Sequence, residues 1–132
     1  MYHIAIVEDE LEFRQQLQEY LQQYEQENDV SFQISMFEDG ADILENYENK
    51  YDIMLLDIEM PKVNGMDAAE KIREQDEDVV LMFITNMAQY AIHGYSVGAL
   101  DFVMKPITYY AFSMKMKRAL KRAQKKEQKP LV

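Results

Sequence analysis

The sequence predicts an α/β fold, a doubly wound sheet of five parallel strands with helices on both faces. Five short apolar segments alternate with five segments in which apolar residues recur every three or four positions. These are the spacings of buried strands and of amphipathic helices. Neighbouring parallel strands need a crossover connection, which is usually a helix. Three of the apolar segments stop abruptly at a polar residue, as strands do when they lead to a ligand-binding edge.

The first half of the chain contributes three strands and three helices to this prediction. Strands are expected over residues 4–7, 31–37 and 53–56. Asp39 and Gly40 start a short helix that continues to about Tyr47. A loop over residues 60–65 precedes a helix over residues 67–74. The first helix is marked by an apolar stripe formed by Phe13, Leu17, Tyr20, Leu21 and Tyr24.

The second half contributes the remaining two strands and two helices. Residues 79–84 form the most continuous apolar run and predict a strand buried on both faces. A weaker helix is expected over residues 88–97, interrupted by Gly94 and closed near Gly98. A last short strand covers residues 102–104. The final helix begins near Tyr109, and its apolar stripe consists of Phe112, Met116, Ala119, Leu120 and Ala123.

Length and composition restrict the class of protein. A chain of 132 residues has room for one domain with a single core. It contains no cysteine, which excludes disulfides, thiol catalysis and thiolate metal sites. No apolar run approaches the roughly 18 residues of a membrane span, and the start of the chain lacks the features of a signal peptide. We therefore expect a cytoplasmic protein without membrane contact.

The net charge of −10 is divided unevenly along the chain. Eight Lys or Arg residues and one Glu lie between Lys115 and Lys129, a net charge of +7, so the residues outside this stretch carry −17. An acidic body repels nucleic acid and favours a cation site. The basic stretch predicts a solvated helix face, although a linker near a DNA-binding domain would look similar. We expect the domain to cover residues 1–124, followed by a basic linker or tail over residues 125–132.

Residues able to transfer a phosphoryl group follow four of the predicted strands. Glu8 and Asp9 follow the first strand, Asp57 the third, Thr85 the fourth and Lys105 the fifth. Ligands of open parallel sheets bind at this edge. Clustered carboxylates repel one another, and Mg²⁺ relieves the repulsion while also accepting phosphate oxygens as ligands. Asp57 could then act as a nucleophile, with Lys105 and Thr85 stabilising the phosphoryl oxygens.

The sequence resembles the receiver domain family of two-component response regulators. The resemblance covers about residues 2–124 and is carried by IVEDE, MLLDIEMPKVNG, FITN and ALDFVMKP, in the family's order and approximate spacing. It implies the (βα)5, flavodoxin-like receiver fold. The segment FITNMAQYAIHGYSVGALDFVMKPI is most similar to receivers that precede LytTR-type DNA-binding domains. Two positions differ from the common pattern, since Asn86 replaces a small residue and Phe102 stands where Tyr is frequent.

The resemblance implies a role in metal binding and phosphorylation for the acidic residues. Asp57 would be the phosphoacceptor. Asp9 would bind Mg²⁺ directly and Glu8 would bind it through water. Glu59 would contribute its backbone carbonyl to the metal.

The resemblance also implies a switch at the ends of the fourth and fifth strands. The hydroxyl group of Thr85 would turn toward the phosphoryl group, and the ring of Phe102 would follow it inward. Lys105 would bind the phosphate, and its peptide bond to Pro106 would be cis. The face made by the fourth helix, fifth strand and fifth helix would then favour a homodimer.

The function implied is a phosphorylation switch, not a metabolic enzyme. A sensor histidine kinase would phosphorylate Asp57, and the domain would control transcription through an absent LytTR-type output domain, the only part to contact DNA. A stand-alone receiver that acts on a protein partner remains an alternative. Asp57 and Glu59 also approximate the acid-x-acid motif of aspartyl-nucleophile phosphohydrolases, although the nucleophile of those enzymes follows the first strand. A flavodoxin-like electron carrier would need a phosphate-binding loop after the first strand, which is missing here.

Overall fold

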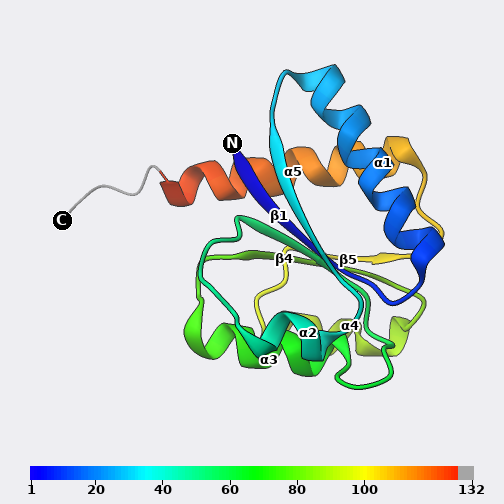
Figure 1. Cartoon of the computed structure of the whole chain (residues 1–132), viewed down its shortest axis with the longest axis vertical. Coiled ribbons are helices and arrows are strands. Elements are labelled where there is room, and N and C mark those ends of the chain that lie inside the picture. Colours follow the sequence, from blue (N-terminus) through cyan, green and yellow to red (C-terminus); the bar gives the residue numbers. More distant parts are fainter. Residues whose placement is uncertain (128–132) are drawn as a thin grey trace.

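The computed structural model describes residues 1–127 and confirms the doubly wound α/β fold (Figure 1). Strands and helices alternate along the chain. The strands are β1 (Tyr2–Val7), β2 (Phe32–Phe37), β3 (Ile53–Leu56), β4 (Val80–Thr85) and β5 (Asp101–Met104). The helices are α1 (Leu11–Asn28), α2 (Gly40–Glu45), α3 (Gly65–Gln75), the 3₁₀ helix η1 (Ala88–Tyr90), α4 (Ala91–Ser96) and α5 (Tyr109–Glu127).

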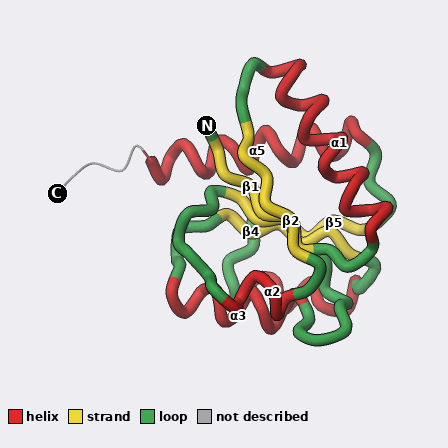
Figure 2. The backbone as a smooth tube through the Cα atoms, viewed as in Figure 1, coloured by secondary structure: helices red, strands yellow, loops and turns green. Residues whose placement is uncertain are grey.

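All strand pairs in the sheet are parallel, in the order β2-β1-β3-β4-β5. The tube in Figure 2 shows the strands side by side at the centre of the molecule. The strand order reverses between β1 and β3, which pair with Ile4 opposite Ile53 and Val7 opposite Leu56. Ligand sites of open α/β sheets lie beyond the carboxyl ends of the strands at such a reversal. Asp57 follows β3 directly at this point.

Helices cover both faces of the sheet: α1 and α5 lie on one face, and α2, α3 and α4 on the other (Figure 1). Because successive strand residues point to opposite faces, β1 sends Ile4 and Ile6 into the core under α1 and α5. Ala5 and Val7 enter the second core under α3. Four strand residues of β3 and six of β4 are fully buried, which explains why these segments are continuously apolar rather than alternating.

The largest departure from the sequence prediction is at the fourth helix. Instead of one helix over residues 88–97 interrupted at Gly94, the chain forms the 3₁₀ helix η1 and then α4, and Gly94 lies inside α4. The predicted end near Gly98 is confirmed, since Gly98 has φ +65°, a conformation that glycine adopts without strain. Thr85 is the last residue of β4 rather than the residue after it.

Helix α5 continues through Glu127. The expected basic segment over residues 125–132 therefore overlaps the last turn of α5, and residues 128–132 lie outside the described part of the chain. Among residues 1–127, no helix is long and apolar enough to cross a membrane.

Candidate functional site

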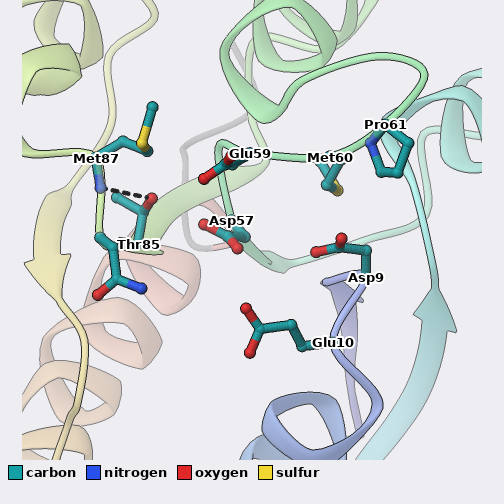
Figure 3. A pocket seen from close by; sticks show the side chains of 9 residues that line it. Asp9, Glu10, Asp57, Glu59, Met60, Pro61, Thr85 and Met87 are labelled. Atoms are coloured by element: carbon teal, nitrogen blue, oxygen red, sulfur yellow. Dashed lines mark hydrogen bonds between the residues drawn. The ribbon is translucent and has the colours of Figure 1, made fainter.

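Three loops at the carboxyl ends of β1, β3 and β4 surround a cavity of about 400 Å³. Figure 3 shows Asp57 near its centre, with Asp9 and Glu10 on one side and Thr85 and Met87 on the other. The wall is completed by Glu59, Met60, Pro61 and Asn86. The cavity thus lies where the strand order reverses, the position expected for a ligand site in this fold.

The structure brings three of the predicted site residues into one acidic cluster. Glu8, Asp9 and Asp57 each offer a carboxylate oxygen, and these oxygens lie within 4.8 Å of one another. Glu8 and Asp57 are buried, whereas Asp9 is exposed. Hard oxygen ligands at this spacing are those that Mg²⁺ or Ca²⁺ takes. The donor set therefore fits a divalent cation on the exposed side of the cluster, next to Asp9.

Lys105 pairs with two members of this cluster. Its Nζ atom lies 2.7 Å from Glu8 Oε1 and 3.0 Å from Asp57 Oδ2, and its side chain is only 7 % exposed. Burial lowers the pKa of Lys105, but its contacts with Glu8 and Asp57 outweigh this effect and raise the pKa above the usual value. The ammonium group therefore stays charged beside Asp57. The peptide bond from Lys105 to Pro106 is cis.

Glu8 is the most buried carboxylate of the cluster, with 1 % of its surface exposed. Burial raises the pKa of Glu8 to about 7, and this rise is only partly offset by Lys105 and by the backbone N–H of Glu10, which donates to Glu8 Oε2 at 3.1 Å. Arg14 fixes the backbone here, because its Nη1 atom donates to the carbonyl oxygen of Glu8 at 2.7 Å. The carboxylate thus has little freedom to move away from Lys105.

Asp57 is held by contacts on both carboxylate oxygens. Oδ1 accepts a 2.7 Å hydrogen bond from the backbone N–H of Ile58, and Oδ2 contacts Lys105. The backbone of the β3–α3 loop folds tightly behind it, since Gly65 N–H donates to Ile58 O at 2.8 Å. A Cβ atom at position 65 would lie 1.8 Å from the backbone oxygen of Asp57. Only glycine can occupy this position without moving the loop that carries Asp57.

Asp39 supports the same loop from the end of β2. Its carboxylate accepts backbone hydrogen bonds of 2.9 Å from Ala41, Lys62 and Val63. Burial raises the pKa of Asp39, but these three hydrogen bonds outweigh it and hold the pKa below its ordinary value. A single side chain therefore caps α2 and fixes the loop that positions Glu59.

Thr85 and Phe102 lie at the ends of neighbouring strands. Thr85 is fully buried, and its Oγ1 atom accepts a 3.1 Å hydrogen bond from the backbone N–H of Met87 (Figure 3). The ring of Phe102 is half-buried and packs on Phe83, with 5.6 Å between the ring centres. Lys105 N–H donates to the backbone oxygen of Thr85 at 3.0 Å, which ties the two strand ends together.

Two residues with contacts at the site were not singled out from the sequence. Arg14 had no predicted role, and Phe13 was assigned only to the apolar stripe of the first helix. The ring of Phe13 lies beneath Lys105 Nζ, 4.2 Å from ring centre to nitrogen. No sequence signal could have revealed these contacts, because they depend on how α1 is placed against β1 and β5.

The fold and the site together define a response regulator receiver domain. The family described as "Response regulator receiver domain" matches residues 4–117. The chain therefore belongs to this family.

Curated relatives and solved structures agree with this assignment. The sensory transduction protein LytT of Oceanobacillus iheyensis is 37 % identical over 134 residues, which cover 98 % of this chain and 53 % of that protein. Response regulator SaeR of Staphylococcus aureus is 29 % identical over 99 % of this chain and 56 % of its own length. The chain thus spans about half the length of the curated relatives it matches.

Among solved structures, the response regulatory domain of protein mrkE from Klebsiella pneumoniae superposes with a TM-score of 0.83 at 25 % identity, covering 93 % of this chain and 98 % of that chain. Response regulator protein TrrA from Thermotoga maritima, solved in complex with Mg²⁺ and a beryllium fluoride, has a TM-score of 0.77 at 28 % identity. The superposition with TrrA covers 90 % of this chain and 99 % of the TrrA chain.

Proposed function

We propose that Asp57 accepts a phosphoryl group from a sensor histidine kinase in a reaction that requires Mg²⁺. The observation that carries the proposal is the position of Asp57, at the centre of an acidic cavity with Lys105 at 3.0 Å. A carboxylate oxygen of Asp57 forms a bond to phosphorus while the phosphorus–nitrogen bond of the phosphohistidine breaks. The electron pair of that bond returns to the imidazole, which leaves.

The metal would be held by Asp9 and Asp57, with Glu8 acting through water and Glu59 through its backbone carbonyl. When bound, Mg²⁺ supplies positive charge that offsets repulsion between the carboxylates and the phosphoryl oxygens. The structure of TrrA in complex with Mg²⁺ and a beryllium fluoride supports this cofactor. Lys105 supplies a second positive charge beside Asp57 Oδ2.

The phosphorylated domain would act as a switch and not as a metabolic enzyme. Thr85 would give up its hydrogen bond from Met87 and donate its hydroxyl hydrogen to a phosphoryl oxygen, and Phe102 would follow it. The change would reach the surface formed by α4, β5 and α5, which we name the output face. Several large apolar side chains of this face are exposed: Ile92, Met104, Tyr110 and Met114. We infer that this face forms a homodimer.

The output domain is proposed to be a DNA-binding domain of the LytTR type. Support comes from the 37 % identity to LytT and from the share of that relative, 53 %, that this chain spans. Residues 1–132 alone are expected not to bind specific DNA sequences, because their net charge is −10. A cytoplasmic location stays a prediction, and a stand-alone receiver that acts on a protein partner stays the alternative to this output domain.

Intact mass spectrometry after incubation with acetyl phosphate and Mg²⁺ tests the proposal. The expected result is the addition of one phosphoryl group, lost in Asp57→Ala and on omission of Mg²⁺. Asp42→Asn is the matched control, because Asp42 is exposed on α2 and does not line the cavity. If the Asp57→Ala variant still gained a phosphoryl group, the proposal would be contradicted. Steady turnover of a generic phosphate ester would instead favour the phosphohydrolase.

A further inference from the structure

The ammonium group of Lys105 contacts an aromatic ring as well as two carboxylates. Nζ lies over the ring of Phe13, 4.2 Å from its centre, while Glu8 Oε1 and Asp57 Oδ2 lie at 2.7 Å and 3.0 Å. The side chain of Lys105 is 7 % exposed. Attraction between a cation and the negative face of an aromatic ring is strongest where water is excluded. The ring is therefore a third partner of the ammonium group.

The structure holds this ring in a fixed position. Phe13 lies in the first turn of α1 and packs against the core between the sheet and helices α1 and α5. Its neighbour Arg14 donates a hydrogen bond to the backbone oxygen of Glu8, which ties the start of α1 to the end of β1. The distance between the Phe13 ring and the carboxylate cluster is thus set by the backbone.

The three partners of Lys105 differ in what a divalent cation does to them. Glu8 and Asp57 belong to the cluster whose oxygens lie within 4.8 Å of one another. A cation bound there would compete with the ammonium group for the negative charge of these carboxylates and would also repel it. The Phe13 ring is not a ligand for a hard cation. Its attraction for Lys105 therefore persists when the attraction from the carboxylates is weakened.

We propose that Phe13 is a positioning residue that keeps the Lys105 ammonium group beside Asp57 while a divalent cation occupies the carboxylates. The ammonium group is then in place for the oxygens of the incoming phosphoryl group. This inference rests on the proposed function of Asp57 as phosphoacceptor. The ring's quadrupole, and not its volume, is the property required, so tyrosine can replace Phe13 and leucine cannot.

Phosphorylation kinetics separate these two substitutions. Phe13→Leu should lower the rate of phosphorylation by acetyl phosphate, and the affinity for beryllofluoride at saturating Mg²⁺, by about threefold to thirtyfold. The affinity for Mg²⁺ should be unchanged, and Phe13→Tyr should restore both properties. Phe32→Leu is the matched control, because Phe32 is another half-buried ring on the same core, stacked on Tyr24 at 6.1 Å. Three results would each overturn the proposal. Phe13→Leu could be phosphorylated at the wild-type rate, it could lose Mg²⁺ affinity in parallel, or Phe13→Tyr could fail to restore the rate and the beryllofluoride affinity.

A second measurement uses the metal-free protein and does not depend on phosphorylation. The ring current of Phe13 should shift the ε-CH₂ protons of Lys105 upfield in NMR spectra of the wild type, Phe13→Tyr and Phe32→Leu. The shift should vanish in Phe13→Leu. If the wild type is phosphorylated on Asp57 without showing this shift, the role of Phe13 is refuted and the proposed function stands. If the shift is present but Asp57 takes no phosphoryl group, the proposed function fails, and the phosphoryl role of Phe13 fails with it.

Discussion

The ammonium group of Lys105 lies closer to Glu8 than to Asp57, at 2.7 Å against 3.0 Å, although Asp57 is the proposed acceptor. All three side chains are at most 7 % exposed. Removing one partner from a buried ion pair leaves an uncompensated charge. Lys105 therefore stabilises the metal-free fold in addition to its proposed contact with phosphate.

Lys105→Met tests both roles. In the metal-free protein at neutral pH we expect the unfolding free energy to fall by about 3 kcal/mol, because the buried Asp57 loses its cation. Glu8, whose pKa is already raised to about 7 by burial, can take up a proton and so adds less to the loss. Mg²⁺ affinity should be retained, and Mg²⁺ should recover part of the lost stability by neutralising the same carboxylates. Beryllofluoride should no longer promote dimerisation. Denaturant titrations with and without Mg²⁺ measure the change in stability. If Mg²⁺ affinity collapsed while beryllofluoride still promoted dimerisation, the assigned role of Lys105 would be wrong.

Asp39→Ala should destabilise the fold in a pH-dependent manner. It removes three backbone hydrogen bonds and leaves the N–H groups of Lys62 and Val63 without their acceptor, a loss of about 1–3 kcal/mol. The folded-state pKa of Asp39 lies below its ordinary value of 3.8. Its charge therefore contributes stability above pH 3.8, and this contribution disappears as the pH falls through the lower folded-state pKa. In urea titrations, the difference in unfolding free energy between wild type and variant should be constant near neutral pH and should become smaller in acid. A gap that widens in acid would contradict the prediction.

Gly65→Ala should disturb the loop that carries Asp57. The added Cβ atom would lie 1.8 Å from the backbone oxygen of Asp57, so the loop must move. We expect a loss of at least about 2 kcal/mol in unfolding free energy and slower phosphorylation. Gly98→Asn is the matched control, since no atom lies within 4 Å of a Cβ at Gly98 and asparagine tolerates positive φ. Gly98→Asn should lower the unfolding free energy by about 1 kcal/mol or less. Equal losses in the two variants would argue against a steric cause at Gly65.

The output face should form a dimer when the site carries a phosphoryl mimic. Sedimentation velocity with Mg²⁺ and beryllofluoride should show a larger dimer fraction than without them. Tyr110 is 74 % exposed on this face, and Tyr110→Glu should weaken the dimer by about 2 kcal/mol, roughly thirtyfold, if the ring is a central contact. Leu11→Glu is the control, because Leu11 is 57 % exposed at the start of α1, outside the output face. A monomer that persists at high protein concentration would count against the dimer.

The sequence by itself determined the fold class and the composition of the site. Strand and helix spacings differ, so alternating segments of the two periods predict a parallel α/β sheet. Because the carboxyl ends of parallel strands meet at one edge, the order of Glu8, Asp9, Asp57, Thr85 and Lys105 along the chain was enough to predict one site. The structure brings the three acids and Lys105 together and ties Thr85 to Lys105 through the backbone.

Only the tertiary structure decided which of these groups are paired and what supports them. Three contacts illustrate this: Lys105 lies closest to Glu8, the ring of Phe13 lies beneath the Lys105 ammonium group, and Arg14 contacts the Glu8 backbone. The first two join segments far apart in the sequence, and the third depends on how α1 packs. The 3₁₀ geometry of η1 and the continuation of α4 through Gly94 were also missed. The physical reason is the same in each case: periodicity records which side of an element is buried, whereas distances between side chains depend on how elements pack against one another.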